Sequence, residues 1–205
     1  MKTLIKICGL TNQEAVDVAV QSGADLIGFV FAKKSPRCIS PELASQLSGS
    51  IPAQVKTTAV MLHPRNIEVK EVFDRFLPDY LQSDAKDFES LNLPEGCHPL
   101  KVYRDRPQLH FNEIDSNKLS LFEGQNSGAG ELVNTDRAAE VAHHAPVILA
   151  GGLNPGNVVS ILNAVQPKGV DVSSGVESEL GVKDVQKIRD FINIVRDYDA
   201  MEQNA

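Results

Sequence analysis

Short apolar runs alternate with amphipathic helical segments along this chain, and this alternation constrains the fold more than any other feature. The run "DLIGFVFA" at 25–32 is almost continuously apolar, which is typical of a parallel strand covered on both faces. Strands that alternate with helices predict a parallel sheet with its helices outside.

Eight strand–helix units are predicted. Strands are expected at 2–7, 25–32, 55–62, 79–83, 98–104, 119–123, 146–152 and 168–174. Helices are expected at 11–23, 40–49, 65–76, 134–144, 155–165 and 184–198, with weaker helical segments at 85–91 and 107–115. The pattern predicts an α/β fold, a compact (β/α)₈ barrel with abbreviated fourth and fifth units. An open doubly wound sheet is the main alternative, but "CGLTN" lacks the glycine-rich loop that binds dinucleotides.

Residue types mark several helix ends. Thr11 and Glu14 have the spacing of a capping box at the start of the first helix. Gly23 is expected to end that helix in the left-handed conformation. Ser40 is expected to cap the second helix, with Pro41 at its first helical position.

Length and composition indicate one globular domain, 1–205, with a polar tail at 199–205 that is expected to fray. Hydrophobic residues make up 42% of the chain, yet no apolar run is long enough to span a membrane. The first residues lack the features of a signal peptide. We therefore expect a cytoplasmic protein that has no membrane partner.

Charge and cysteine content exclude further classes. The net charge is −7, which argues against nucleic acid as a partner. Cys8, Cys38 and Cys97 are too widely spaced to suggest disulfides or a zinc site. The five histidines are scattered, so no metal site is expected.

The ends of the last two predicted strands suggest a phosphate site. Gly151 and Gly152 follow the seventh strand in "ILAGGLNPGNV", and Ser173, Ser174 and Gly175 follow the eighth in "VDVSSGVES". Small residues let backbone N–H groups approach an anion, and "GVES" is a candidate for the short extra helix of such sites. The alternative is that the glycines only form tight turns.

Two residues at strand ends are candidates for acid–base chemistry. Cys8 ends the first strand. One interpretation is a thiolate base, which would need a lowered pKa. The alternative is that Cys8 is a small buried apolar residue. Glu123 ends the sixth strand, where desolvation would raise its pKa as a general acid requires; the alternative is a solvated charge. The glycine-rich loop at 124–130 is expected to close over a ligand.

Other polar residues near strand ends are candidates for binding. Arg37 offers a guanidinium that matches a carboxylate, although a solvated basic loop is the ordinary interpretation. Asp171 lies within the eighth strand, where it orients a substrate hydroxyl or bonds only to backbone. Gln82 and Asp84 end the fourth strand.

Four segments together resemble the phosphoribosylanthranilate isomerase family of tryptophan biosynthesis: "KICGLTNQEAVDVAVQSGADLIGFVF", "KSPRCISPE", "ILAGGLNPGNV" and "GVDVSSGVES". The resemblance runs from about residue 4 to 195 and is weak between about 80 and 140. It implies a (β/α)₈ barrel without a cofactor that carries out an Amadori rearrangement of a small phosphorylated substrate. We expect a monomer or a weak homodimer.

The resemblance also implies roles for individual residues. Cys8 matches the catalytic base, Arg37 the arginine that holds the anthranilate carboxylate, and Asp171 an aspartate near the substrate. The residues that match the phosphate loops are Gly151, Gly152, Ser173, Ser174 and Gly175.

Two departures from the family pattern concern the acid side of the site. The sixth strand ends "LFEG" where the family has a pattern like "LLDT", so Glu123 stands in place of the usual aspartate acid. Asp136, farther along the chain, is the other candidate. The fourth strand ends "LQSDA" where the family often has "QLHG", so Gln82 remains and Asp84 takes the place of a histidine.

Two alternatives to the isomerase follow. One is a sugar-phosphate-binding relative on the same barrel that is non-catalytic or has altered specificity. The other is a sugar-phosphate aldolase or lyase, which needs a Schiff-base lysine in the barrel mouth. Lys6 and Lys101 are poorly placed for this, because neither ends a strand.

Overall fold

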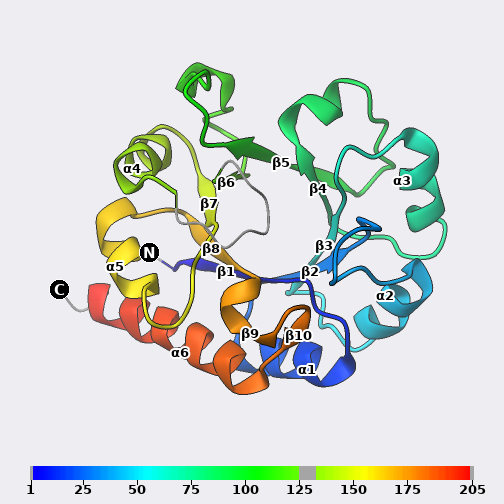
Figure 1. The fold of residues 1–205 in the computed structure, drawn as a ribbon, viewed down its shortest axis with the longest axis horizontal. Coiled ribbons are helices and arrows are strands. Elements are labelled where there is room, and N and C mark those ends of the chain that lie inside the picture. Colours follow the sequence, from blue (N-terminus) through cyan, green and yellow to red (C-terminus); the bar gives the residue numbers. More distant parts are fainter. Residues whose placement is uncertain (1, 125–132, 204–205) are drawn as a thin grey trace.

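A computed structural model, which describes residues 2–124 and 133–203, forms a closed barrel of eight parallel strands surrounded by helices (Figure 1). The strands are β1 (Leu4–Cys8), β2 (Leu26–Val30), β3 (Lys56–Val60), β4 (Tyr80–Asp84), β5 (His98–Arg104), β6 (Ser120–Glu123), β7 (Val147–Ala150) and β8 (Gly169–Val172). Each strand pairs with the next, and β8 pairs with β1. The predicted (β/α)₈ barrel is confirmed.

Six α-helices are present in the described part of the chain. They are α1 (Gln13–Ser22), α2 (Pro41–Ser48), α3 (Asn66–Phe73), α4 (Thr135–His144), α5 (Val158–Val165) and α6 (Val185–Glu202). Units four and five carry only the 3₁₀ turns η1 (Ala85–Glu89) and η2 (Phe111–Glu113), as the abbreviated pattern predicted. Within the described residues, no helix has both the length and the apolar character that crossing a membrane requires.

A third 3₁₀ turn and a small hairpin follow β8. The turn η3 (Ser174–Val176) leads into β9 (Glu177–Glu179), which pairs antiparallel with β10 (Val182–Lys183) before α6 begins. The short helix expected at "GVES" is therefore a 3₁₀ turn that begins one residue earlier.

The start of α1 differs by one residue from the prediction. Asn12 is the N-cap, and its side-chain oxygen accepts a 2.9 Å hydrogen bond from the Ala15 N–H. The predicted cap at Thr11 is wrong, because Asn12 holds the extended backbone and reaches the free N–H. Gly23 ends α1 with φ of 99°, as predicted.

The start of α2 follows the prediction. Ser40 accepts a hydrogen bond of 3.2 Å from the Leu43 N–H. Pro41 occupies the first helical position, where its missing N–H costs nothing and its fixed φ suits the helix.

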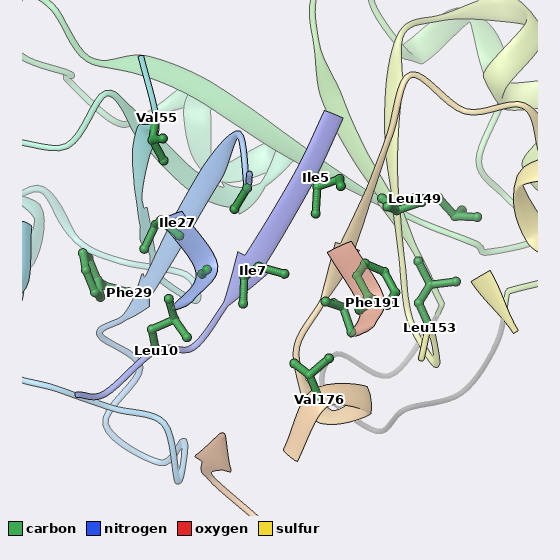
Figure 2. Packing of buried hydrophobic residues seen from close by; sticks show 14 of the residues in the cluster. Ile5, Ile7, Leu10, Ile27, Phe29, Val55, Leu149, Leu153, Val176 and Phe191 are labelled. Atoms are coloured by element: carbon green, nitrogen blue, oxygen red, sulfur yellow. The ribbon is translucent and has the colours of Figure 1, made fainter. Parts of the chain in front are cut away.

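Alternate residues of each strand face two different cores. Ile5 and Ile7 of β1 point outward and pack in the layer between strands and helices, which also contains Leu149 of β7 and Phe191 of α6 (Figure 2). A smaller cluster fills the barrel interior, namely Leu26, Leu100, Val102, Leu121, Ile148 and Ala150. Because strand residues alternate between faces, Lys6 and Cys8 point into the barrel.

The end of the chain is held more firmly than the sequence suggested. Asp199 is buried in α6, where it accepts hydrogen bonds from the Thr3 backbone N–H at 3.1 Å and the Thr3 hydroxyl at 2.6 Å. Arg196 also pairs with Asp199. The helix end predicted at 198 is wrong, because α6 continues to Glu202 and Asp199 ties its last turns to the start of β1. Fraying of the tail stays a prediction, and 204–205 lie outside the described residues.

Replacing Asp199 should show how strongly this contact stabilises the barrel. We expect Asp199→Asn to lower the free energy of unfolding by about 2–4 kcal/mol, because an amide cannot replace a buried carboxylate that accepts from three groups. Equilibrium unfolding in urea measures this, with Asp74→Asn in the exposed Lys70–Asp74 pair as the matched control. Equal stability of the two variants would contradict the role of Asp199.

Candidate active site

A cavity of about 430 Å³ opens at the carboxyl ends of the strands. Ten of the predicted site residues line it: Cys8, Arg37, Gln82, Asp84, Glu123, Gly151, Gly152, Asp171, Ser173 and Ser174. Gly175 and Asp136 do not line it. A smaller cavity of about 240 Å³ lies between the loops after β2 and β3, without the residues of the candidate acid–base pair.

The two small-residue loops lie at one side of this cavity. Gly151 and Gly152 follow β7 with φ of 101° and 64°, backbone conformations that favour glycine. Gly175 serves a different purpose, because a Cβ there would lie 1.8 Å from the Leu153 carbonyl oxygen. Glycine at 175 therefore lets the loop after β8 cross closely over the loop after β7.

Cys8 lies on the cavity wall above a buried ion pair. The Lys6 ammonium is fully buried and lies 2.9 Å from the Asp171 carboxylate. Gly28 faces Cys8 in the β1–β2 register. A Cβ on Gly28 would lie 3.0 Å from the Cys8 sulfur and 3.2 Å from Lys6 Nζ, so this glycine leaves room for both groups.

The charges around Cys8 oppose one another. Burial raises the pKa of the Cys8 thiol, and Asp171 adds to this effect, whereas Lys6 and Lys183 lower it; the net change is a rise. A thiolate base requires a lowered pKa, and the Cys8 thiol does not have one in the free protein. Among these groups, the positive charge of Lys6 is the largest influence that lowers the pKa of the Cys8 thiol.

Lys6 is also unsuited to a Schiff base. Burial acts to lower its pKa, but Asp171 and Cys8 outweigh burial, and the pKa of Lys6 is raised. A raised pKa favours the protonated amine, which is no nucleophile. Lys101 lines a groove outside the cavity, so neither lysine supports the aldolase alternative.

Arg37 is buried and does not belong to a solvated loop. Its Nε and Nη2 donate to the two carboxylate oxygens of Glu177 at 2.6 and 2.9 Å. Lys183 donates to Glu177 at 2.8 Å and to the Ser173 carbonyl oxygen at 2.8 Å. Burial acts to raise the pKa of Glu177, but Arg37 and Lys183 lower it to about 2.

Sequence reasoning missed the functional interest of Glu177 and Lys183. The only signal was a carboxylate two residues beyond Gly175, in a loop already considered as a phosphate site. Nothing local in the sequence joins this carboxylate to a guanidinium 140 residues away.

The acid side of the cavity is built around Arg104 of β5. Arg104 donates to Asp84 at 2.6 Å and lies 2.7 Å from the Glu123 carboxylate. Arg104 thus balances the extra negative charge that Asp84 brings. Asp136 lies in the first turn of α4, is exposed and does not line the cavity. The loop expected to close over a ligand lies, at 125–130, outside the described residues.

Gln82 offers a hydrogen-bond acceptor to a ligand. Its side-chain oxygen is buried and has no hydrogen-bond partner among residues 2–124 and 133–203. An unpaired buried acceptor is costly, so a ligand N–H or O–H that reached it would be favoured. In the same part of the chain, no group of three or more metal-ligating side chains is present.

Comparison with known proteins gives one consistent result. Residues 5–194 match the family model described as N-(5'phosphoribosyl)anthranilate (PRA) isomerase. A relative from Geotalea uraniireducens named N-(5'-phosphoribosyl)anthranilate isomerase is 36% identical over 196 residues, covering 93% of this chain and 97% of the relative.

Solved structures agree with the sequence relatives. Phosphoribosyl anthranilate isomerase from Thermus thermophilus superposes with a TM-score of 0.83 at 26% identity, covering 96% of this chain and 100% of its own. A second isomerase, in complex with reduced 1-(o-carboxyphenylamino)-1-deoxyribulose 5-phosphate, gives 0.76 at 28% identity, with 95% and 99% covered.

The influence of Lys6 on Cys8 can be measured directly. We expect Lys6→Met to raise the pKa of the Cys8 thiol further and to slow its alkylation by iodoacetamide several-fold at pH 8, because the nearest positive charge is lost. Mass spectrometry of the Cys8 peptide follows the reaction across pH.

A double variant separates this effect from the loss of a partner for Asp171. Lys6→Met with Asp171→Asn leaves no unpaired carboxylate, so folding is spared. The pKa of the Cys8 thiol in the double variant should be higher than its pKa in the Asp171→Asn single variant. Equal alkylation by these two variants would show that Lys6 only neutralises Asp171.

Proposed function

Since this chain belongs to the N-(5'-phosphoribosyl)anthranilate isomerase family, we propose that it catalyses the Amadori rearrangement of N-(5-phosphoribosyl)anthranilate. The product is 1-(2-carboxyphenylamino)-1-deoxyribulose 5-phosphate, an intermediate of tryptophan biosynthesis. One observation supports the proposal from the residues of this chain itself. Cys8 on β1 and Glu123 on β6 line a single cavity whose wall also includes Arg37 and the glycine and serine loops.

The two charged ends of the substrate bind at separate places. The phosphate lies between the loop of Gly151 and Gly152 and the loop of Ser173 and Ser174, whose small residues let backbone N–H groups approach. The anthranilate carboxylate lies at Arg37. Fixing both ends holds the reacting carbons between the acid and the base.

The reaction moves protons without an external oxidant. Glu123 protonates the furanose oxygen, and the ring opens to an iminium at C1. Cys8 takes the proton from C2, which gives an enolamine that tautomerises to the ketose. C2 is oxidised as C1 is reduced, so the electrons balance within one molecule and no redox cofactor is needed.

The reactive form requires one proton to change places. Burial raises the pKa of the Cys8 thiol in the free protein, whereas Glu123 forms an ion pair with Arg104 as a carboxylate. In the reactive form Cys8 is the thiolate and Glu123 the acid. The total charge is the same in both forms, so substrate binding needs only to favour one arrangement over the other.

The setting follows from this chemistry. The substrate is a small phosphorylated molecule, and we place the enzyme in the cytoplasm as a monomer or weak homodimer. The membership of the chain in a family of biosynthetic enzymes supports the cytoplasmic location, because the intermediates of such pathways are soluble.

Two substitutions test the roles of acid and base. We expect Cys8→Ala and Glu123→Gln each to lower kcat by about 10²–10⁴-fold, because each removes one proton-transfer group. The loss of phosphoribosylanthranilate fluorescence measures turnover. Cys38→Ala, at an exposed cysteine outside the main cavity, is the matched control and should keep full activity.

Two results would contradict these assignments. An active Glu123→Gln variant would exclude Glu123 as the acid. An inactive wild-type protein that still binds the reduced product analogue would favour a non-catalytic binding relative on the same barrel.

A further inference from the structure

Glu177 is the first residue of β9, and its carboxylate is fully engaged beneath the cavity wall. One oxygen accepts from Arg37 Nε at 2.6 Å and Lys183 Nζ at 2.8 Å. The other accepts from Arg37 Nη2 at 2.9 Å and the Gly181 N–H at 3.2 Å. The three charged residues are each less than a tenth exposed.

The paired hydrogen bonds fix the plane of the Arg37 guanidinium. A two-bond contact between guanidinium and carboxylate defines orientation as well as distance. Nε and one N–H of Nη2 are used by Glu177, and no hydrogen bond joins Nη1 to another described residue. Since Arg37 lines the cavity, the edge formed by Nη1 and Nη2 is left for a ligand.

The charge of this cluster remains suited to an anion. Lys183 donates to the Ser173 carbonyl oxygen, the Ser173 hydroxyl and Glu177, and these three acceptors match the three N–H groups of an ammonium. Two cations thus surround one carboxylate, which leaves one net positive charge. Glu177 therefore orients Arg37 without cancelling its attraction for a ligand carboxylate.

The hairpin that carries Glu177 packs directly on the loop that carries Arg37. Gly181, in the turn between β9 and β10, has φ of 84°, and a Cβ there would lie 2.8 Å from the Pro36 carbonyl oxygen. Such close backbone approach holds the hairpin against the residue that precedes Arg37. Through Lys183, the same hairpin reaches Ser173 in the loop after β8.

We propose that Glu177 is a positioning residue for carboxylate recognition, which fixes the Arg37 guanidinium so that its free edge faces the carboxylate of the substrate. Glu177 does not touch the ligand; it acts through Arg37. The inference rests on the proposed function, because it concerns the site at which the anthranilate carboxylate binds.

A pair of ligands tests this role in the full-length protein. The first ligand is the reduced product analogue, reduced 1-(o-carboxyphenylamino)-1-deoxyribulose 5-phosphate. The second is the same compound prepared from aniline, which keeps the phosphate and lacks the carboxylate. Isothermal titration calorimetry gives the affinity of each variant for both.

Glu177→Gln should weaken binding of the carboxylate ligand by about tenfold or more and leave binding of the aniline ligand unchanged. An amide supplies one acceptor oxygen and turns an N–H toward the donors of Arg37 or Lys183, so the paired contact is broken. In turnover assays KM should rise more than kcat falls, because ground-state binding is what is lost.

Three further variants make the result specific. Arg37→Met should show the same selective loss, and adding Glu177→Gln to it should cause no additional loss if the two residues act as one unit. Asp199→Asn breaks a partly buried ion pair with Arg196 at the opposite end of the barrel. It is the control for stability and should leave both affinities unchanged.

Other outcomes would overturn the inference. An equal loss for both ligands would show that Glu177 supports the loops in general, and unchanged or tighter binding of the carboxylate ligand would show that orientation of Arg37 is irrelevant. Failure of the proposed function is a separate result, because wild-type protein would then convert no phosphoribosylanthranilate, whatever its affinities for the two ligands.

Discussion

The seam between β1 and β8 is the contact on which the rest of the molecule depends. These two strands come from opposite ends of the chain and pair in parallel. In their register Lys6 lies opposite Asp171. The buried ion pair between them lies inside the barrel where the first and last strands meet. A hydrogen bond from the Ser173 hydroxyl to the Cys8 carbonyl oxygen continues the seam to the rim. The candidate base and the candidate phosphate loop are neighbours only because the barrel closes.

Two groups of charged side chains lie on opposite sides of the cavity. The group of Arg37, Glu177 and Lys183 carries one net positive charge. Across the barrel, Arg104 lies between the carboxylates of Asp84 and Glu123. A chain of net charge −7 thus offers an anion a local positive wall.

Structural features that depend only on residues close together in the sequence could be predicted from the sequence. The strand periodicity, the αL glycine at 23, the Ser40–Pro41 helix start and the small residues after β7 and β8 all follow from local backbone rules. Thr11 and Asn12 are both good caps, so only the folded backbone decides between them. The ion pairs were not accessible, because they join side chains such as Arg37 and Glu177 through the register of distant strands and a hairpin. The raised pKa of Cys8 has the same origin, since burial depends on what the other strands place around the thiol.

The replacement of two outer helices by η1 and η2 gives the barrel wall an uneven thickness. Only single 3₁₀ turns cover the outside after β4 and β5, where the Tyr103 hydroxyl reaches the Glu113 carbonyl oxygen at 3.0 Å. The arc from β7 through β8 to β2 lies instead under α5, α6 and α1 (Figure 1). Local opening favours segments with few buried apolar contacts, so the arc that carries Asp84, Arg104 and Glu123 is the part of the barrel expected to exchange its amide hydrogens first. The arc under α5, α6 and α1, which carries Cys8 and the loops after β7 and β8, is expected to exchange its amide hydrogens later.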